Sequence, residues 1–304
     1  MARRVTRPRE LQFQVFRGSA AIRQGLLTSV ALRSESWVRV RHDVYADSRL
    51  ERDHELACRA ATLRVPADAV IAGPSAAVLW GIPHAARVDD PVHLLVPPGS
   101  PLGARNGLRV HEAQVEERDV VARADLRRTT PTRTAWDVAA WLEVTRAVAI
   151  IDSMLANRLV SVASLTRMVD RERGSRYSVR AAAAFGLADA GAQSPPESHL
   201  RVGLVLAGLP RPVTQHPIQL PDGTVVHPDP AWPEYQVAVE YDGHWHADPD
   251  QLHRDRSRLN RLVAAGWLVL HVTSRRPYRD LARVVREVRE ALRSRGWGSA
   301  TSAR

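Results

Sequence analysis

The sequence predicts an α/β protein, α+β overall, because apolar residues recur at both helical and strand spacing along its 304 residues. Hydrophobic residues make up 44% of the chain, enough to build ordinary buried cores. The clearest boundary is the stretch 191–196, which is rich in glycine and proline. We therefore expect three parts: residues 1–48, an α+β segment over 49–190, and a mixed sheet flanked by helices over 192–304.

All 43 basic side chains are arginine, and the chain contains no lysine. This excludes a standard P-loop ATPase, which needs a Gly-Lys pair, and enzymes that form a Schiff base on lysine. The net charge of +10 is unevenly distributed. Residues 1–48 carry +5, residues 192–253 carry −6 and residues 254–304 carry +9. Two basic blocks around an acidic centre favour a partner with a phosphate backbone.

The cysteine and hydropathy patterns point to the cytoplasm. The single cysteine, Cys58, excludes an intramolecular disulfide and a CxxC zinc knuckle, and its helical, apolar surroundings predict a buried side chain. No apolar segment follows the basic start of the chain, and no apolar run approaches the ~18 residues of a membrane span. We expect a cytoplasmic protein with no membrane partner.

Residues 11–45 predict a winged helix-turn-helix, a DNA-binding motif. A short helix over 19–25 is followed by a second over 30–33, capped by Thr28 or Ser29. Strands over 37–41 and 44–45 would form the wing. The candidate nucleic-acid-binding residues are Arg23, Arg33, Arg39 and Arg41. The alternative is a small helical hairpin whose arginines are merely solvated.

The middle segment predicts helices and strands but no catalytic constellation. The expected elements are a helix over 49–64, a strand over 70–72, a helix over 76–80, strands over 92–96 and 108–111, and helices from 132 to 185. We interpret Asp137 as a carboxylate at a helix start rather than as a catalyst.

The third part predicts the order helix, three strands, helix, strand, helix. Its elements are a helix over 195–208, strands over 213–220, 224–228 and 236–241, a helix over 252–265, a strand over 267–273 and a helix over 280–295.

Two acids of this part are candidate metal ligands. Asp229 ends the second arm of the predicted hairpin, and Glu240 lies within an otherwise apolar strand. A carboxylate in such a strand is costly unless it is paired or binds a metal. With the carbonyl of Tyr241, the two carboxylates form an oxygen ligand set that suits Mg²⁺ or Mn²⁺. Such an ion would polarise a phosphodiester and activate a water.

Other groups nearby leave alternatives open. His244 and His246 form an i, i+2 pair that could bind zinc, but the sequence supplies no clear third ligand. Three arginines recur at helical spacing and would either clamp phosphate or form a solvated face: Arg254, Arg258 and Arg261.

Residues 192–295 resemble the restriction-endonuclease-like domain related to very-short-patch-repair endonucleases. The resemblance rests on Asp229, Ala238-Val239-Glu240-Tyr241-Asp242-Gly243, His246, Asp255, Arg258 and Gly266-Trp267, and on the helix that starts at Ser194-Pro195-Pro196-Glu197. It implies that Asp229 and Glu240 bind the metal and that Glu197 is a supporting acid. Asp242 stands where the parent fold has lysine, and with His246 it would lie nearest the nucleophilic water. The domain would then either cut DNA through these replacements or bind it without cutting.

The first half resembles AbiEi-type antitoxins of type IV toxin–antitoxin systems. The matching segments are residues 11–46, Gly73-Pro74-Ser75-Ala76-Ala77-Val78-Leu79-Trp80-Gly81 and Thr132-Arg133-Thr134-Ala135-Trp136-Asp137. The resemblance implies a winged-helix DNA-binding autorepressor with a cognate toxin as partner. Asp43 stands where the wing of that family usually has glycine.

Together these patterns predict a DNA-binding protein with a Mg²⁺-dependent endonuclease domain. The alternative is a non-catalytic antitoxin or transcriptional repressor that carries a degenerate nuclease fold. A third interpretation is an interaction module for a partner toxin.

Overall fold

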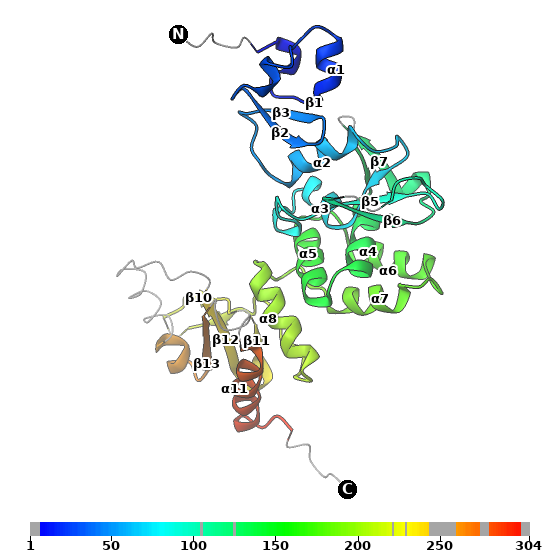
Figure 1. Ribbon diagram of the computed structural model, residues 1–304. Coiled ribbons are helices and arrows are strands. Elements are labelled where there is room, and N and C mark those ends of the chain that lie inside the picture. Colours follow the sequence, from blue (N-terminus) through cyan, green and yellow to red (C-terminus); the bar gives the residue numbers. More distant parts are fainter. Residues whose placement is uncertain are drawn as a thin grey trace, which may run out of the picture. The chain divides into compact units, whose positions relative to one another are not determined.

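The computed structural model describes residues 7–103, 106–123, 126–220, 222–228, 230–242, 260–273 and 280–298, with the backbone alone at 241, 242 and 273. Helices and mixed sheets alternate along the chain, which confirms the predicted α+β class (Figure 1). The chain divides into two compact units, Met1–Trp141 and Leu142–Arg304. This division differs from the predicted boundaries near residues 48 and 191.

The first unit begins with a three-stranded antiparallel sheet in the order β1-β3-β2. The elements are β1 (Val15–Arg17), α1 (Gly18–Arg23), β2 (Trp37–Arg41) and β3 (Val44–Asp47). The predicted second helix is only a single 3-10 turn, Ala31–Arg33, whose first amide bonds the hydroxyl of Thr28. The chain becomes extended at Ser34, and Trp37 then enters the hydrophobic cluster, where its ring lies edge-on to Phe16 at 5.1 Å. The predicted first helix and the predicted hairpin are therefore present, whereas the predicted second helix is a 3-10 turn.

The turn between β2 and β3 depends on Asp43. Its φ of 59° is a left-handed conformation, which glycine adopts most readily and which Asp tolerates better than most residues. The carboxylate accepts hydrogen bonds from the Ser19 amide at 2.8 Å, the Ser19 hydroxyl at 2.7 Å and Arg17 Nε at 3.2 Å. Asp43 thus keeps the turn geometry that a wing glycine would provide and also caps α1.

A five-stranded mixed sheet in the order β6-β5-β4-β8-β7 forms the rest of this unit. Its strands are β4 (Val70–Ile71), β5 (Val92–Val96), β6 (Leu108–Glu112), β7 (Val120–Arg123) and β8 (Leu126–Thr129). The helices are α2 (His54–Thr62), α3 (Gly73–Leu79) and α4 (Pro131–Trp141). Cys58 is fully buried in the core of this unit, as predicted, and burial raises the pKa of its thiol to about 12.

Asp137 does not lie at a helix start. It occupies the middle of α4, is almost fully buried, and accepts a 2.8 Å hydrogen bond from Arg133 Nε. Burial raises the pKa of this carboxyl to about 7, because the loss of hydration outweighs the attraction of the Arg133 cation. The interpretation of Asp137 as a helix-start carboxylate is therefore wrong, and its contacts are internal to the fold.

The second unit combines a group of helices with the predicted C-terminal sheet. Its helices are α5 (Val144–Ala156), α6 (Val162–Arg171), α7 (Ser178–Leu187), α8 (Pro195–Leu206) and α11 (Leu281–Ser294), and residues 260–264 are also helical. Its strands are β9 (Ile218–Gln219), β10 (Val225–Val226), β11 (Ala231–Trp232), β12 (Val237–Asp242) and β13 (Leu268–Thr273). From α8 onward the order agrees with the prediction except for β11, an unpredicted short strand between the second and third predicted strands, and only residues 260–265 of the predicted helix 252–265 are described.

A buried ion pair explains why the helices before residue 190 belong to this unit. Arg201 of α8 donates to Asp152 of α5 at 2.6 Å, and both side chains are 1% exposed. Ser198 of α8 and the amide of Asp189 bond the same carboxylate. The contact joins α5 to the helix that opens the C-terminal sheet domain, so the predicted boundary at residue 191 lies inside one compact unit.

Candidate functional site

The candidate site lies on one face of the sheet β11-β12-β13. Strands β12 and β13 are parallel, and their register places Glu240 opposite His271. Side chains of a strand alternate between the two faces of a sheet. Val237 and Val239 pack in the core beside α8 and α11, whereas Ala238 packs against Leu262 on the other face. Glu240 therefore shares the face of Ala238, beside the helical residues 260–264.

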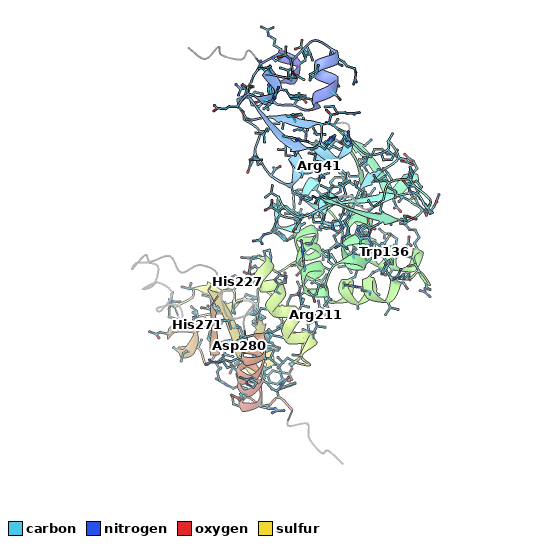
Figure 2. The ribbon with its side chains drawn as sticks, in the orientation of Figure 1. Arg41, Trp136, Arg211, His227, His271 and Asp280 are labelled. Atoms are coloured by element: carbon cyan, nitrogen blue, oxygen red, sulfur yellow. The ribbon has the colours of Figure 1, made fainter. Side chains whose placement is uncertain are left out.

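The Glu240 carboxylate lies close to the imidazole of His271, which Figure 2 labels. Glu240 Oε2 is 4.0 Å from His271 Nε2, and the two side chains are 12% and 33% exposed. Both residues are fourth in six-residue parallel strands. The sequence interpretation missed His271. The sequence pattern that could have indicated His271 is an ionisable residue inside the apolar run 268–272, the same pattern that singled out Glu240.

The neighbours of the predicted Asp229 and Glu240 pair are hydrogen-bonded to each other. The amide of Val239 donates to the carbonyl of Pro230 at 2.8 Å, and Ala231 pairs with Ala238 in the antiparallel register of β11 and β12. Asp229 itself lies outside the described residues, as do His246, Arg254 and Arg258. The backbone of Asp242 ends β12, but its side chain is not described.

Glu197 has a structural role in α8. Its carboxylate accepts hydrogen bonds from the Gln193 amide at 2.8 Å and the Ser194 hydroxyl at 2.9 Å. Ser194 is the N-cap residue of the helix and in turn accepts from the Glu197 amide. This reciprocal pattern satisfies the free amides at the helix start. The geometry thus assigns Glu197 to helix capping, which the family resemblance does not indicate.

Arg261 is the member of the predicted phosphate clamp that the structure describes. Its Nη1 bonds Asp222 Oδ2 at 2.9 Å, which joins the helical residues 260–264 to the turn between β9 and β10. A hydrogen bond from the Thr224 amide, with the Arg261 contact, lowers the pKa of Asp222 to about 2. Arg261 therefore already forms an ion pair within the domain.

The four predicted arginines of the N-terminal region differ in their surroundings. Arg23, Arg33 and Arg39 are exposed, although Arg33 Nε also donates to the Ser29 carbonyl. Arg41 is partly buried and donates to the carbonyls of Asn106 and Gly107 at 3.3 and 2.9 Å (Figure 2). A β-bulge separates Arg39 from Arg41 in the β2–β3 register. Arg41 thus holds the hairpin to the loop before β6, and this contact opposes its predicted role in DNA binding.

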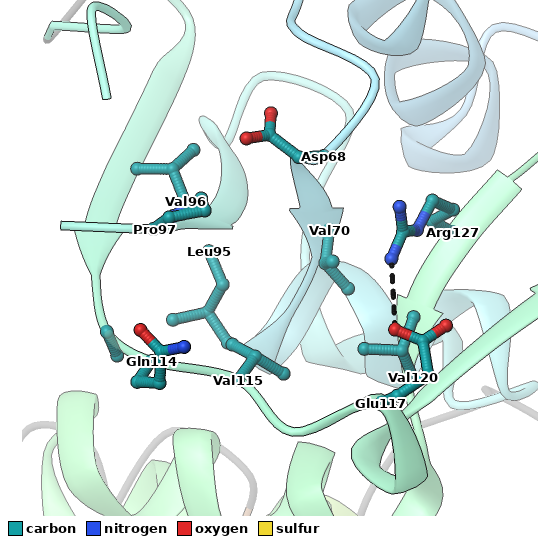
Figure 3. A pocket seen from close by; sticks show the side chains of 11 residues that line it. Asp68, Val70, Leu95, Val96, Pro97, Gln114, Val115, Glu117, Val120 and Arg127 are labelled. Carbon is teal, nitrogen blue, oxygen red and sulfur yellow. Dashed lines mark ion pairs between the residues drawn. The ribbon is translucent and has the colours of Figure 1, made fainter. Parts of the chain in front are cut away.

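A pocket in the first unit lies among the ends of strands β4 to β8 (Figure 3). Its lining is mainly apolar, with the polar side chains of Asp68, Gln114, Glu117 and Arg127 at its edge. Arg127 Nη2 lies 3.6 Å from Glu117 Oε2. At about 120 Å³ the cavity is smaller than the 300–1,000 Å³ typical of ligand pockets, and we assign it no ligand.

Two proteins of Mycobacterium tuberculosis are similar to this chain over most of its length. They are "Uncharacterized protein MT2308" of strain CDC 1551 / Oshkosh and "Uncharacterized protein Rv2248" of strain ATCC 25618 / H37Rv. Each is 33% identical over 269 residues, which cover 86% of this chain and 96% of the relative. The chain belongs to their family. No family model matches the chain.

The similarity to these family members extends over both compact units, because neither Met1–Trp141 nor Leu142–Arg304 is long enough to contain 269 residues. Among solved structures, the crystal structure of RV2827C protein from Mycobacterium tuberculosis matches with a TM-score of 0.40 and 16% identity. That match covers 68% of this chain and 84% of the RV2827C chain.

None of the described helices combines the length and apolar character needed to cross a membrane. Within the same residues, no group of three or more His, Cys, Asp or Glu side chains is arranged to hold a metal ion. Of the two predicted metal ligands, only Glu240 lies among the described residues, and its nearest titratable neighbour across the strands is His271 at 4.0 Å.

Proposed function

We propose that this protein binds DNA and cleaves its phosphodiester bonds with a divalent metal ion held by Asp229 and Glu240. The observation that carries the proposal is the position of Glu240, a nearly buried carboxylate on β12 beside the Val239–Pro230 hydrogen bond. Asp229 directly precedes Pro230 in the sequence and lies outside the described residues. This supports a pair of carboxylates at one end of the sheet.

The residues at hand fit a hard divalent cation. Glu240 is 12% exposed, and its face of the sheet is apolar around Ala238 and Leu262. A carboxylate in such surroundings is costly unless a cation compensates its charge. Its oxygen atoms, with those of Asp229 and the carbonyl of Tyr241, form the ligand type that Mg²⁺ and Mn²⁺ accept.

When bound, the metal would polarise the scissile phosphate and lower the pKa of an attacking water. The role of Glu240 is to hold the ion on this face of the sheet, from its central strand β12. Ala238, two residues earlier on the same face, packs with Leu262 in a buried apolar cluster. By the family resemblance, Asp242 and His246 would position the water, since the chain contains no lysine.

Exposed arginines support a DNA substrate. Residues 1–48 carry nine arginines against four acids, and Arg23, Arg33 and Arg39 are exposed there. Arginine binds phosphate through two parallel N–H bonds, and each neutralised phosphate releases counterions. We propose that these side chains hold the duplex backbone while the second unit performs the cleavage.

A cleavage assay tests the proposal directly. Full-length protein is incubated with supercoiled and linear duplex DNA and with Mg²⁺ or Mn²⁺ in excess over the protein. We expect nicking or cutting that is lost in Asp229→Asn and Glu240→Gln and is retained in Glu234→Gln, whose residue is exposed just before β12.

Two outcomes would contradict the proposal. Cleavage that persists in both carboxylate variants would identify a contaminating nuclease. Tight DNA binding by the wild type without cleavage under either metal would assign the alternative function, a non-catalytic repressor with a degenerate nuclease fold.

A further inference from the structure

We infer that His271 is a further ligand of the proposed metal centre and makes it select Mn²⁺ over Mg²⁺. The inference rests on the proposed function, because it concerns the ion held by Glu240. It assigns a role to a residue that neither the family resemblance nor the pattern of acids singles out.

The parallel register places both side chains on one face. Glu240 and His271 are direct neighbours across β12 and β13, so their Cβ atoms project to the same side of the sheet. Val269 and Ala238, two residues earlier on each strand, pack in the same cluster, which confirms the alternation. Both functional groups therefore approach one point from adjacent strands.

The distance between the two groups suits a shared ion. Metal–ligand bonds of about 2.1 to 2.2 Å place two ligand atoms roughly 3 Å apart when they are adjacent around the ion and roughly 4.3 Å apart when they are opposite. Glu240 Oε2 and His271 Nε2 are 4.0 Å apart, inside that range. At this distance the atoms do not form a direct hydrogen bond, and a small side-chain rotation brings both to an ion between them.

The imidazole determines which ion the centre prefers. Mg²⁺ strongly favours oxygen ligands and retains its water shell, whereas imidazole nitrogen is a good ligand for first-row transition metals. Carboxylate oxygens also suit Mn²⁺, so one nitrogen among oxygens shifts the preference to Mn²⁺ without excluding Mg²⁺. The His271 side chain is 33% exposed as a whole but its Nε2 atom is buried, so binding requires the side-chain rotation described above.

Metal binding is measured on the full-length protein without DNA. The free Mn²⁺ signal in electron paramagnetic resonance gives the Mn²⁺ Kd, and competition gives the Mg²⁺ Kd. In His271→Asn we expect at least about tenfold weaker Mn²⁺ binding, since even the outer partners of metal ligands typically contribute 10–100-fold, and a much smaller change for Mg²⁺. His227→Asn, an exposed histidine of the same domain, serves as the matched control and should bind like the wild type.

A second variant tests the chemistry of the ligand while keeping a ligand in place. His271→Asp provides an oxygen, so we expect it to bind Mg²⁺ more tightly than His271→Asn does and to lose the preference for Mn²⁺. Circular dichroism and thermal melting of every variant show whether it folds.

The outcomes separate this inference from the proposed function. If Glu240→Gln weakens binding of both ions while His271→Asn and His271→Asp bind Mn²⁺ like the wild type, the role of His271 is wrong and the metal centre stands. If the wild type binds neither ion in the presence or absence of DNA, both proposals are overturned.

Discussion

Replacing Asp43 by alanine is expected to destabilise the start of α1 by roughly 2 to 3 kcal/mol, from two separate losses. The first loss is the cap, because the Asp43 carboxylate accepts the Ser19 amide at 2.8 Å and the Ser19 hydroxyl at 2.7 Å. Removing such a cap typically costs about 1 kcal/mol. The second loss is conformational, because alanine at a φ of 59° costs about 1 to 2 kcal/mol, whereas Asp tolerates this region better.

Companion variants separate these two contributions. Asp43→Gly removes the cap but relieves the backbone, so we expect a loss of about 1 kcal/mol or less. Asp43→Asn keeps an acceptor oxygen and tolerates the left-handed region, so its loss should be smaller still. Partial burial alone would raise the pKa of Asp43, but the hydrogen bonds from Ser19 and Arg17 outweigh it and lower the pKa.

The pH dependence follows from the sign of that shift. A carboxyl whose pKa is lowered by folding stabilises the folded state above its unfolded pKa of ~3.9, and this contribution is lost as the pH falls through the lowered value. The difference between wild type and Asp43→Asn should therefore shrink below about pH 4.

Hydrogen exchange of the segment 15–25 measures the effect locally. A loss of about 2 kcal/mol corresponds to roughly 30-fold faster exchange of the Ser19 amide, if exchange proceeds by local opening. Segments of the five-stranded sheet serve as the internal reference. Equal protection in the Ala, Gly and Asn variants would refute both the cap and the backbone argument.

Three further predictions concern groups whose environments the tertiary structure defines. Burial raises the pKa of Asp137 to about 7, so the folded state keeps this proton at pH values where the unfolded state has already lost it. The contribution of Asp137 to stability is therefore greatest below pH ~4 and falls as the pH rises to 7. The Tm should decline less between pH 5 and 8 in Asp137→Asn than in the wild type. Arg201→Met leaves the buried Asp152 without its cation, so the free energy of unfolding measured in urea should fall by about 3–5 kcal/mol. Adding Asp152→Leu removes the unpaired carboxylate and should recover part of this loss. If the double variant recovers nothing, the two residues are not energetically coupled. Arg39→Ala should weaken DNA binding measured by fluorescence anisotropy and reduce the slope of log affinity against log salt concentration by about 0.9. Arg41→Ala should mainly lower the Tm, because Arg41 bonds backbone carbonyls within its own unit. A reversal of these two effects would contradict the assigned roles.

Apolar periodicity predicted the elements that supply most of the C-terminal hydrophobic core. Strands β12 and β13 were visible as apolar runs, and α11 as residues repeating at helical spacing. The hairpin β7–β8 was missed, because Arg127 and Arg128 interrupt its apolar pattern. In the structure the guanidinium of Arg128 stacks over the Trp80 ring, 3.8 Å from its centroid. A cation is therefore buried at a strand position where the periodicity argument expects an apolar side chain.

Side-chain roles were less predictable than strands. Asp229 and Glu240 were chosen because carboxylates in apolar surroundings need a partner, and that argument requires only local sequence. Glu197 was assigned by the family resemblance and Arg41 by its place on the predicted wing, but contacts with Ser194 and Gly107 occupy them. Charge is a property of the sequence, whereas the partner that satisfies it depends on folding.

By itself the sequence determined the α+β class, the order of the C-terminal elements apart from the short strand β11, the arginine-only charge blocks and the acid at position 240. These follow from composition and from short-range periodicity. Only the tertiary structure decided that Glu240 faces His271, that α5 belongs with α8 and that Asp43 caps α1. Each of these contacts joins residues far apart in the chain, and strand register and helix packing set such contacts rather than any local pattern.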